Sequence, residues 1–405
     1  MADVSDYIPS FGDLRATCAQ VSAFEAARAE LIAAGDVPAE DIELGCVVRL
    51  DRGFPLVATA SGLCFRAEHA VDFAKGKRKK RGGAAARGAD SALKRKGSRK
   101  GKGVVAARDA EDAASARAAV DEQMLPCVGD FVVVRVPSTH DMGVILRVLP
   151  RRSSFERWRG KNRGERQVLA ANVDVIFIVQ PLGADHAALP IMRDRVARSL
   201  VLARDCGAEP VVMLTKADRC PESEVAEVID DLQRLVGPGV RVIATSSREG
   251  RGMDEVRACV PRGICAMILG ESGAGKSTLL NTLLGVEALE TNDVRERDDA
   301  GRHTTVARIM VALPGPCGVI ADCPGLRSLP LVGHERGLAR AFPEIVEASH
   351  ACRFNDCTHT HEPGCAVLEG VEEGEIEQVR VEAFLALARE MRVSAQSLDP
   401  DIHLP

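Results

Sequence analysis

The stretch "MILGESGAGKSTLLN", residues 267–281, decides the fold of this 405-residue chain. Its centre, Gly270–Ser277, matches the phosphate-binding pattern G-x-x-x-x-G-K-[ST] and lies between a short apolar run and a helix-forming segment. In such a loop backbone N–H groups surround the phosphates, the Lys276 amine reaches the β- and γ-phosphates, and the Ser277 hydroxyl binds Mg²⁺. The alternative is a glycine-rich turn that binds nothing. The expected nucleotide contacts in this segment are Gly270, Glu271, Ser272, Gly273, Ala274, Gly275, Lys276, Ser277 and Thr278.

Two further motifs follow the phosphate loop. The apolar run "GVIADCPG" ends in Asp322, which can hold Mg²⁺, and in Gly325, whose N–H can meet the γ-phosphate. Between this run and the loop, "GRHTTVAR" supplies Thr304 and Thr305 as candidate magnesium ligands. Asp-x-Pro-Gly alone is also ordinary turn chemistry. The order of phosphate loop, threonine and D-x-x-G is nevertheless that of the first half of a GTPase.

The motif that reads the base comes earlier in the chain, at "TKAD", residues 215–218. The Asp218 carboxylate can accept N1–H and N2–H of guanine, a donor pair that adenine lacks. About thirty residues later, "ATSSREG" offers backbone groups that could meet guanine O6. T-K-x-D alone could be an exposed loop, but its pairing with this serine-rich strand end favours a guanine site. The expected base-side contacts are Thr215, Lys216, Ala217, Asp218, Ser246 and Ser247.

The base-reading half therefore precedes the phosphate half, which reverses the usual order. Apolar runs such as "VDVIFIVQPL", "PVVMLTKAD" and "CAMILGESG" alternate in part with helical stretches, which is typical of a buried parallel sheet with ligand loops at its carboxyl ends. Exchanged halves can assemble in the same way if the old ends are joined and the new ends open at the surface. We expect residues 151–330 to form a circularly permuted α/β P-loop GTPase domain, entered through a basic linker, "RRSSFERWRGKNRGERQ".

Residues 44–150 are predicted to form a small β-barrel, and residues 1–43 a helical, peripheral segment. The stretches "GCVVRLDRGFPLVATASGLCFRAE", "VGDFVVVRV" and "MGVILRVLP" contain short Val- and Leu-rich runs separated by turn residues. Five such strands suit a Greek-key OB-fold, which often binds nucleic acid, or another small barrel that serves as a scaffold.

A basic insertion, at about residues 74–118, interrupts the predicted barrel. Between Lys75 and Lys102 the chain has thirteen Lys or Arg and one Asp, a net charge of +12, whereas the whole chain carries −5. A segment so basic and free of aromatic residues cannot bury a core, so we expect it to be disordered. Because charges this dense repel one another unless phosphates neutralise them, an RNA-binding arm is favoured over a solvated loop without a partner.

Residues 331–405 are predicted to form a small α-helical domain that binds zinc. In "CRFNDCTHTHEPGC" the spacing C-x4-C-x-H-x5-C supplies three thiolates and one imidazole for a tetrahedral Zn²⁺. Four protein ligands leave no open position, so one structural ion is expected. His361 is a rival ligand, chance clustering of reduced cysteines is the alternative, and an iron–sulfur cluster is disfavoured because one ligand would be His. The four expected ligands are Cys352, Cys357, His359 and Cys365.

The composition is that of an ordinary soluble protein, with 46% hydrophobic and 27% charged residues. No apolar run approaches the roughly 20 residues that span a bilayer, and the chain does not start like a secretory signal. Ten of the thirteen cysteines are scattered, which suggests reduced thiols in the cytoplasm.

Taken in order, "QVLAANVD", "TKAD", "GESGAGKSTLLN", "GRHTT", "DCPG" and the cysteine cluster resemble the motifs of the bacterial ribosome small-subunit-dependent GTPases. The resemblance implies a cytoplasmic GTPase with an OB-fold and a zinc module. It also implies partners, namely GTP or GDP, the 30S subunit and its 16S rRNA, and a late step of small-subunit maturation such as release of an assembly factor. We expect a monomer without a membrane partner. The alternatives are a large-subunit assembly GTPase, whose relatives lack the cluster, a GTP-sensing RNA-binding switch with negligible catalysis, and a P-loop ATPase or kinase, which Asp218 disfavours.

Two positions bear on how such an enzyme would work. Members of that family usually carry Asn where this chain has Thr215, which should weaken hydrogen bonding on the base side. Ras-like enzymes orient the attacking water with a Gln directly after D-x-x-G, but this chain has Leu326 there, so GTP hydrolysis by the chain alone should be slow and stimulated by the 30S subunit. His303 is the candidate catalytic residue because it lies beside Thr304, and a surface His on a loop is the alternative.

Overall fold

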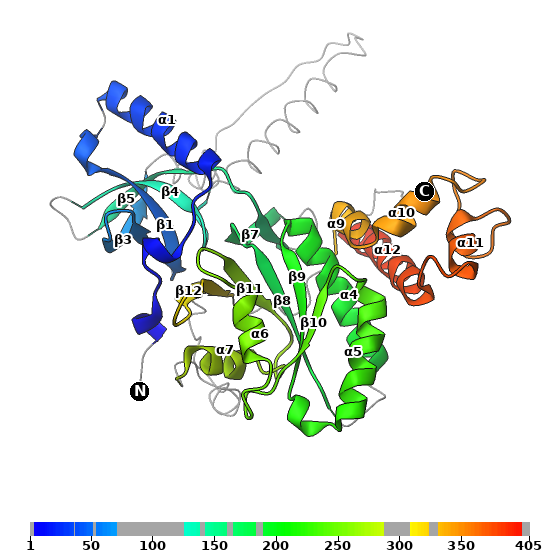
Figure 1. Ribbon diagram of the computed structural model, residues 1–405. Coiled ribbons are helices and arrows are strands. Elements are labelled where there is room, and N and C mark those ends of the chain that lie inside the picture. The colour runs from blue at the N-terminus through cyan, green and yellow to red at the C-terminus, as the bar shows by residue number, and fades with distance from the viewer. Residues whose placement is uncertain are drawn as a thin grey trace, which may run out of the picture.

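The protein consists of three parts, a barrel, an α/β domain and a helical C-terminal region, which follow one another across Figure 1 from blue to red. The computed structural model describes residues 4–35, 37–51, 54–70, 125–137, 142–159, 165–183, 189–286, 308–323 and 331–398. Several sequence predictions lie outside these residues, namely the basic insertion, His303, Thr304, Thr305, Gly325 and Leu326.

Five strands form the closed barrel that the sequence predicts. β1 pairs with both β2 and β4, β3 pairs in parallel with β5, and β4 pairs with β5, so that every strand has two neighbours in the barrel. Val47, Val132 and Ile145 are among the fully buried residues inside it. The barrel strands are β1 (Ile42–Leu50), β2 (Pro55–Thr59), β3 (Cys64–His69), β4 (Phe131–Arg135) and β5 (Gly143–Val148). The OB-fold-like barrel is confirmed.

The N-terminal segment covers one side of this barrel. It contains three short 3₁₀ helices and α1 (Cys18–Ala34), which begins in a capping box between Thr17 and Gln20 and ends at Gly35 in the left-handed region. Phe24 of α1 packs in one cluster with Phe131 of β4. The 3₁₀ helices are η1 (Val4–Tyr7), η2 (Phe11–Asp13) and η3 (Ala39–Asp41).

The predicted linker at residues 151–167 is wrong, because its residues form most of a β-hairpin. β6 (Ser154–Arg159) pairs antiparallel with β7 (Glu165–Ala171). Phe155 and Leu169 are fully buried in the large core cluster, and the charged residues between them disguise the apolar positions. A strand pair that buries only alternate side chains is easily mistaken for a basic loop.

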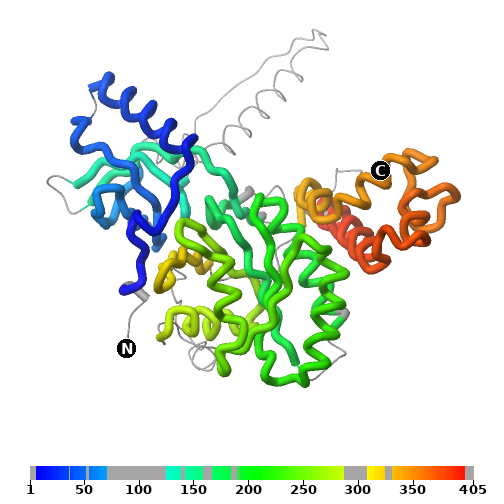
Figure 2. The backbone as a smooth tube through the Cα atoms, viewed as in Figure 1, coloured from blue at the N-terminus to red at the C-terminus, as the bar shows by residue number. Residues whose placement is uncertain are grey.

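The α/β domain is one sheet with helices on both faces (Figures 1 and 2). The strand order is β10-β9-β8-β11-β13-β12, in which the first five strands are parallel and β12 is antiparallel to β13. The strands are β8 (Val175–Pro181), β9 (Glu209–Thr215), β10 (Arg241–Ala244), β11 (Cys265–Leu269), β12 (Arg308–Ala312) and β13 (Val319–Asp322). The helices and the 3₁₀ helix are α4 (Leu189–Cys206), η5 (Ala217–Arg219), α5 (Glu222–Val236), α6 (Met253–Ala258) and α7 (Lys276–Leu284).

The two faces of this sheet are buried by different helices. Ile176 and Ile178 of β8 pack in one cluster with residues of α4 and α5, whereas Phe177 and Val179 pack in another with residues of α6 and α7. This alternation explains why the strands appear in the sequence as continuous apolar runs. All parallel strands end at the same edge, where the predicted nucleotide motifs begin.

The C-terminal region is helical, as predicted, and is fastened to the α/β domain. Arg380 of α12 is buried, forms an ion pair with Glu344 at 2.5 Å, and donates hydrogen bonds to the carbonyl oxygens of Leu235 and Ala341. No helix within the described ranges is long and apolar enough to cross a membrane. The helices of this region are α9 (Glu335–Ala341), α10 (Pro343–Ser349), α11 (Ala366–Glu372) and α12 (Gln378–Leu398).

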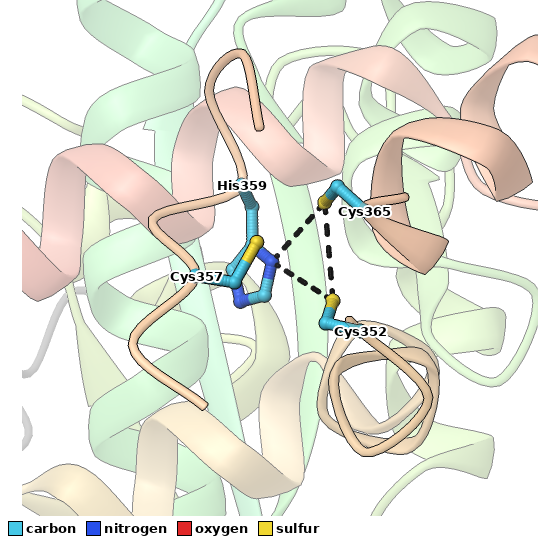
Figure 3. A group of neighbouring side chains, drawn as sticks. All are labelled: Cys352, Cys357, His359 and Cys365. Carbon is cyan, nitrogen blue, oxygen red and sulfur yellow. Dashed lines mark hydrogen bonds between the residues drawn. The ribbon is translucent and has the colours of Figure 1, made fainter. Parts of the chain in front are cut away.

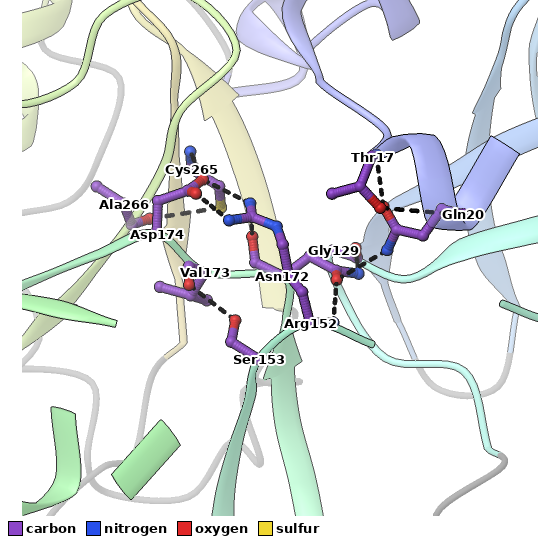
Figure 4. Close-up of polar contacts among 10 residues, drawn as sticks. All are labelled: Thr17, Gln20, Gly129, Arg152, Ser153, Asn172, Val173, Asp174, Cys265 and Ala266. Carbon is purple, nitrogen blue, oxygen red and sulfur yellow. Dashed lines mark hydrogen bonds and ion pairs between the residues drawn. The ribbon is translucent and has the colours of Figure 1, made fainter. Parts of the chain in front are cut away.

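A buried asparagine joins α1, the barrel and the hairpin (Figure 4). Asn172 has a φ of 57° and is 3% exposed. Its Oδ1 accepts hydrogen bonds from Gln20 Nε2 at 3.0 Å and from the Arg152 N–H at 3.1 Å, while its Nδ2 donates to the Gly129 carbonyl at 2.8 Å.

The same hydrogen-bond network extends to the strand that precedes the phosphate loop. Arg152 forms a bidentate ion pair with Asp174, and the Cys265 N–H donates a hydrogen bond to Asp174 Oδ2 at 2.8 Å. Cys265 is the first residue of β11, so the start of that strand is tied to the barrel through side chains.

We expect Asn172→Ala to lower the apparent free energy of unfolding by about 2–4 kcal/mol, because it removes partners from the buried Gln20 amide and the Gly129 carbonyl. Urea denaturation followed by circular dichroism measures the loss. Arg147→Ala is the control, since it removes only an exposed ion pair between β5 and Glu30 of α1, worth about 0–1 kcal/mol. Equal losses of unfolding free energy in the two variants would show that the hydrogen bonds of Asn172 do not stabilise the contact between α1, the barrel and the hairpin.

Candidate nucleotide site and metal centre

The phosphate loop has the backbone that its sequence predicts. It connects β11 to α7 and passes through Gly273 and Gly275, whose φ angles are 81° and 89°. A Cβ at Gly270 would lie 2.7 Å from the Val179 carbonyl oxygen, so a larger residue would push the loop off the sheet. Lys276 Nζ donates hydrogen bonds to the carbonyl oxygens of Gly270 at 2.8 Å and Glu271 at 2.5 Å. The amine therefore lies within the loop, where phosphate would bind.

The base-reading motif follows β9 at the same edge of the sheet. Asp218 Oδ1 accepts a hydrogen bond from Ser246 Oγ at 2.7 Å. This bond is the main reason that the pKa of Asp218 lies below its ordinary value. An ionised carboxylate only accepts hydrogen bonds, which is the state that the two guanine donors require.

Ser246 supports Asp218 in a way that the sequence did not reveal. Its side chain is fully buried, and its backbone N–H donates to the Arg251 carbonyl at 3.1 Å. One of the two backbone groups expected to face guanine O6 is therefore already engaged. Of the expected pair, Ser247 is left as the candidate donor to O6, and Ser246 acts through its hydroxyl.

Thr215 and Lys216 bring the base-reading motif into contact with the phosphate loop. Thr215 Oγ1 donates to the Ala274 carbonyl at 2.7 Å, and Lys216 Nζ donates to the Gly273 carbonyl at 2.9 Å. Thr215 is 5% exposed. Its hydroxyl thus binds the loop, whereas the sequence had suggested only a weaker contact with the base.

The expected magnesium ligands are divided between the described and the undescribed residues. Asp322 ends β13, and the pairing of Ala321 with Met267 places it level with Ile268, just before the phosphate loop. Ser277 is in the first turn of α7. Both residues thus lie at the carboxyl-terminal edge of the sheet, Ser277 in the helix that follows the phosphate loop and Asp322 at the end of the neighbouring strand.

The predicted metal ligands come together in the C-terminal region (Figure 3). The ligand atoms of Cys352, Cys357, His359 and Cys365 all lie within 4.8 Å of one another. His359 Nδ1 is 3.6 Å from the Cys352 sulfur and 3.4 Å from the Cys365 sulfur, and these two sulfurs are 3.9 Å apart. A tetrahedral ion with bonds of about 2.3 Å would separate its ligands by about 3.8 Å, so the donor set fits such an ion.

His361 lies outside this cluster. It is exposed, and its Nδ1 is hydrogen-bonded to Thr360 Oγ1 at 2.8 Å.

Desolvation, together with hydrogen bonds to the Cys365 and Cys352 thiols, raises the pKa of Cys357 to about 12. Three sulfurs this close would repel one another as thiolates, so a cation is needed to hold them ionised.

The strand order, the phosphate loop and the base-reading motif define a circularly permuted GTPase. The family model described as "RsgA GTPase" matches residues 148–332. A protein of Streptomyces avermitilis named "Small ribosomal subunit biogenesis GTPase RsgA" is 42% identical over 270 residues, 67% of this chain and 70% of the relative. One of the same name from Methanosarcina acetivorans is 38% identical over 279 residues, 69% of this chain and 73% of the relative. The chain therefore belongs to the RsgA GTPase family.

Two solved structures share the fold. YjeQ from Thermotoga maritima has a TM-score of 0.56 at 21% identity and covers 87% of this chain and 99% of its own. YloQ, described as a circularly permuted GTPase, has a TM-score of 0.52 at 20% identity and covers 87% and 96%. The permuted fold predicted from the motif order is confirmed.

We expect the purified protein to carry about one divalent ion per chain, and Cys357→Ser to lose it, because three remaining ligands no longer enclose the ion. Elemental analysis of both proteins measures the stoichiometry. Cys317→Ser replaces a half-buried cysteine outside the cluster and should keep the ion. A parent protein without any divalent ion after metal-supplemented purification would contradict the assignment.

Proposed function

We propose that this protein hydrolyses GTP and acts in biogenesis of the small ribosomal subunit. The observation that carries the proposal is the contact between the two motifs, in which Thr215 and Lys216 bind the phosphate loop while Ser246 holds Asp218. Base and phosphates of one nucleotide would meet both motifs together. The names of the relatives from Streptomyces avermitilis and Methanosarcina acetivorans support the choice of pathway.

The proposed roles follow from the chemistry of each group. Asp218 accepts two hydrogen bonds from guanine, and Lys276 leaves the loop carbonyls to bind the β- and γ-phosphates. Mg²⁺ would be held by Ser277 and Asp322, together with Thr304 or Thr305. Its chemistry is to neutralise charge on the β- and γ-phosphates. The Gly325 N–H is proposed to face the γ-phosphate.

The metal of the C-terminal region is proposed to be Zn²⁺. Three cysteine sulfurs and one imidazole form a donor set that zinc prefers, and four protein ligands complete a tetrahedron. The ion would therefore be structural. It would hold the residues between α10 and α11, which have few buried side chains of their own.

The proposed partners are the 30S subunit and its 16S rRNA, contacted by the barrel and the C-terminal region of a cytoplasmic monomer. The proposed step is a late one in subunit maturation, such as release of an assembly factor. A large-subunit assembly role and a GTP-sensing switch without catalysis are the alternatives. Sedimentation with purified 30S and 50S subunits, each with GDP and with a non-hydrolysable GTP analogue, tests whether the protein binds the small or the large subunit. The rate of GTP hydrolysis distinguishes an enzyme from a switch without catalysis.

We expect Asp218→Asn to weaken GTP binding at least about tenfold, because a charged hydrogen bond contributes roughly 1.5–3 kcal/mol, and to favour xanthine nucleotides. Titration with fluorescent GTP and XTP analogues measures both. Asp254→Asn, which changes an exposed carboxylate on α6 that is paired with Arg257, is the control and should bind GTP normally. Unchanged GTP affinity in Asp218→Asn would refute the guanine site.

We expect the 30S subunit to stimulate GTP hydrolysis strongly and the 50S subunit to have little effect. His303→Ala should lower the stimulated rate at least about tenfold without changing GTP affinity, because its imidazole is proposed to orient the attacking water. Phosphate release under multiple turnover measures the rate. His350→Ala, an exposed histidine after α10, is the control. A parental rate in His303→Ala would leave the water to be ordered by other groups.

A further inference from the structure

The phosphate loop carries an acid that is paired with a neighbouring helix. Glu271 is the second residue of the loop, and its Oε2 lies 2.8 Å from Arg195 Nη2 of α4. The backbone carbonyl of the same residue accepts a hydrogen bond from Lys276 Nζ at 2.5 Å. A carboxylate is therefore attached to the piece of backbone that holds the phosphate-binding amine.

An acid at this position opposes the task of the loop. A nucleoside triphosphate brings about four negative charges into the loop, and each of them is repelled by a nearby carboxylate. The guanidinium of Arg195 offsets that charge, since arginine remains protonated at any physiological pH. The ion pair thus bears on how much negative charge the loop can accept.

The surroundings of the pair limit its strength. Arg195 and Glu271 border a cleft of about 790 Å³ between α4, the start of the phosphate loop and α12. Their side chains are 42% and 55% exposed. Water and salt screen a pair so exposed, so the effect on binding should be several-fold rather than a hundredfold.

The same helix offers a second ion pair, whose acid belongs to the C-terminal region. Arg198 lies one turn further along α4, borders the same cleft and is 2.5 Å from Glu390 of α12. Its side chain is 34% exposed. Arg198 is the same residue type as Arg195, lies on the same helix and is exposed to a similar extent, but its acidic partner belongs to the C-terminal region.

We propose that Arg195 is a positioning residue of the nucleotide site, which acts through Glu271 by neutralising an acid of the phosphate loop so that the loop accepts a triphosphate. The inference deepens the proposed function and rests on its nucleotide site. Arg195 is not proposed to contact the base or the phosphates. Its contribution therefore depends on the number of phosphate charges and on the presence of the Glu271 carboxylate.

The test compares guanosine, GDP and GTP, at constant Mg²⁺, in the parent protein, Arg195→Gln, Glu271→Gln and the double variant. Arg195→Gln should weaken GTP binding about three- to fivefold at low salt, GDP binding less, and guanosine binding not at all. The loss should shrink at high salt because exposed charges are screened. Glu271→Gln alone should bind GTP more tightly than the parent, because it removes a negative charge from the loop and keeps the positive charge of Arg195, and the double variant should regain parental affinity. Calorimetric titration measures all four proteins.

Arg198→Gln is the control and should leave all three affinities unchanged. An equal loss for guanosine and GTP in Arg195→Gln would overturn the proposal, because a general distortion of the site does not depend on phosphate charge. A double variant as weak as Arg195→Gln would also overturn it, since the arginine would then act on the phosphates directly. A parent protein that binds no GTP would refute the nucleotide site itself. A parent protein that binds GTP, but in which the effects of the Arg195 and Glu271 variants are independent, would refute only the role of Arg195.

Discussion

The carboxylate of Asp174 links the α/β domain to the barrel through side-chain hydrogen bonds. It accepts the first N–H of β11 and pairs with Arg152, which in turn donates its backbone N–H to Asn172. Through Asn172 the same point reaches Gln20 of α1 and the barrel. β11 is only five residues long and ends at the phosphate loop. The barrel and the nucleotide site are consequently held at opposite ends of one short strand, and a shift of either must strain buried hydrogen bonds.

The reversed order of the two GTPase halves has little effect on the finished site, because parallel strands present all their ligand loops at one edge. β11 comes from the second half and inserts between β8 and β13. Contacts across the junction then replace chain continuity. The hydroxyl of Thr215 holds the Ala274 carbonyl across fifty-nine residues of sequence.

The parts that the sequence predicts best are those in which neighbouring residues act together. The phosphate loop, T-K-A-D and the cysteine spacing are local patterns, and the barrel strands are short Val- and Leu-rich runs between turn residues, so the fold class and the Cys/His cluster that could hold a metal could be predicted. Residues whose partners lie far away could not. Nothing near Gln20 indicates that its amide meets Asn172, 152 residues later. Glu271 looks like an ordinary loop position until α4 supplies Arg195. The hairpin at Phe155 could not be recognised because charged residues surround each buried residue. Only the folded structure shows that the ring of His359, and not that of His361, lies in the cysteine cluster.

The position of β11 in the sheet also has a consequence while the chain is being synthesised. β8 and β9 are made early and can pair at once, but the other edge of β8 pairs with β11 through Val175 and Ala266. Some ninety residues separate these partners, which at 5–20 residues per second is a delay on the order of ten seconds. The pairing of β1 with β12 forms later still, since Arg49 of β1 pairs with Ile309 of β12. During that interval an apolar parallel strand edge is open, and such an edge readily pairs with other chains. The late synthesis of β11 thus has no consequence for the folded protein but leaves the nascent one open to pairing with other chains.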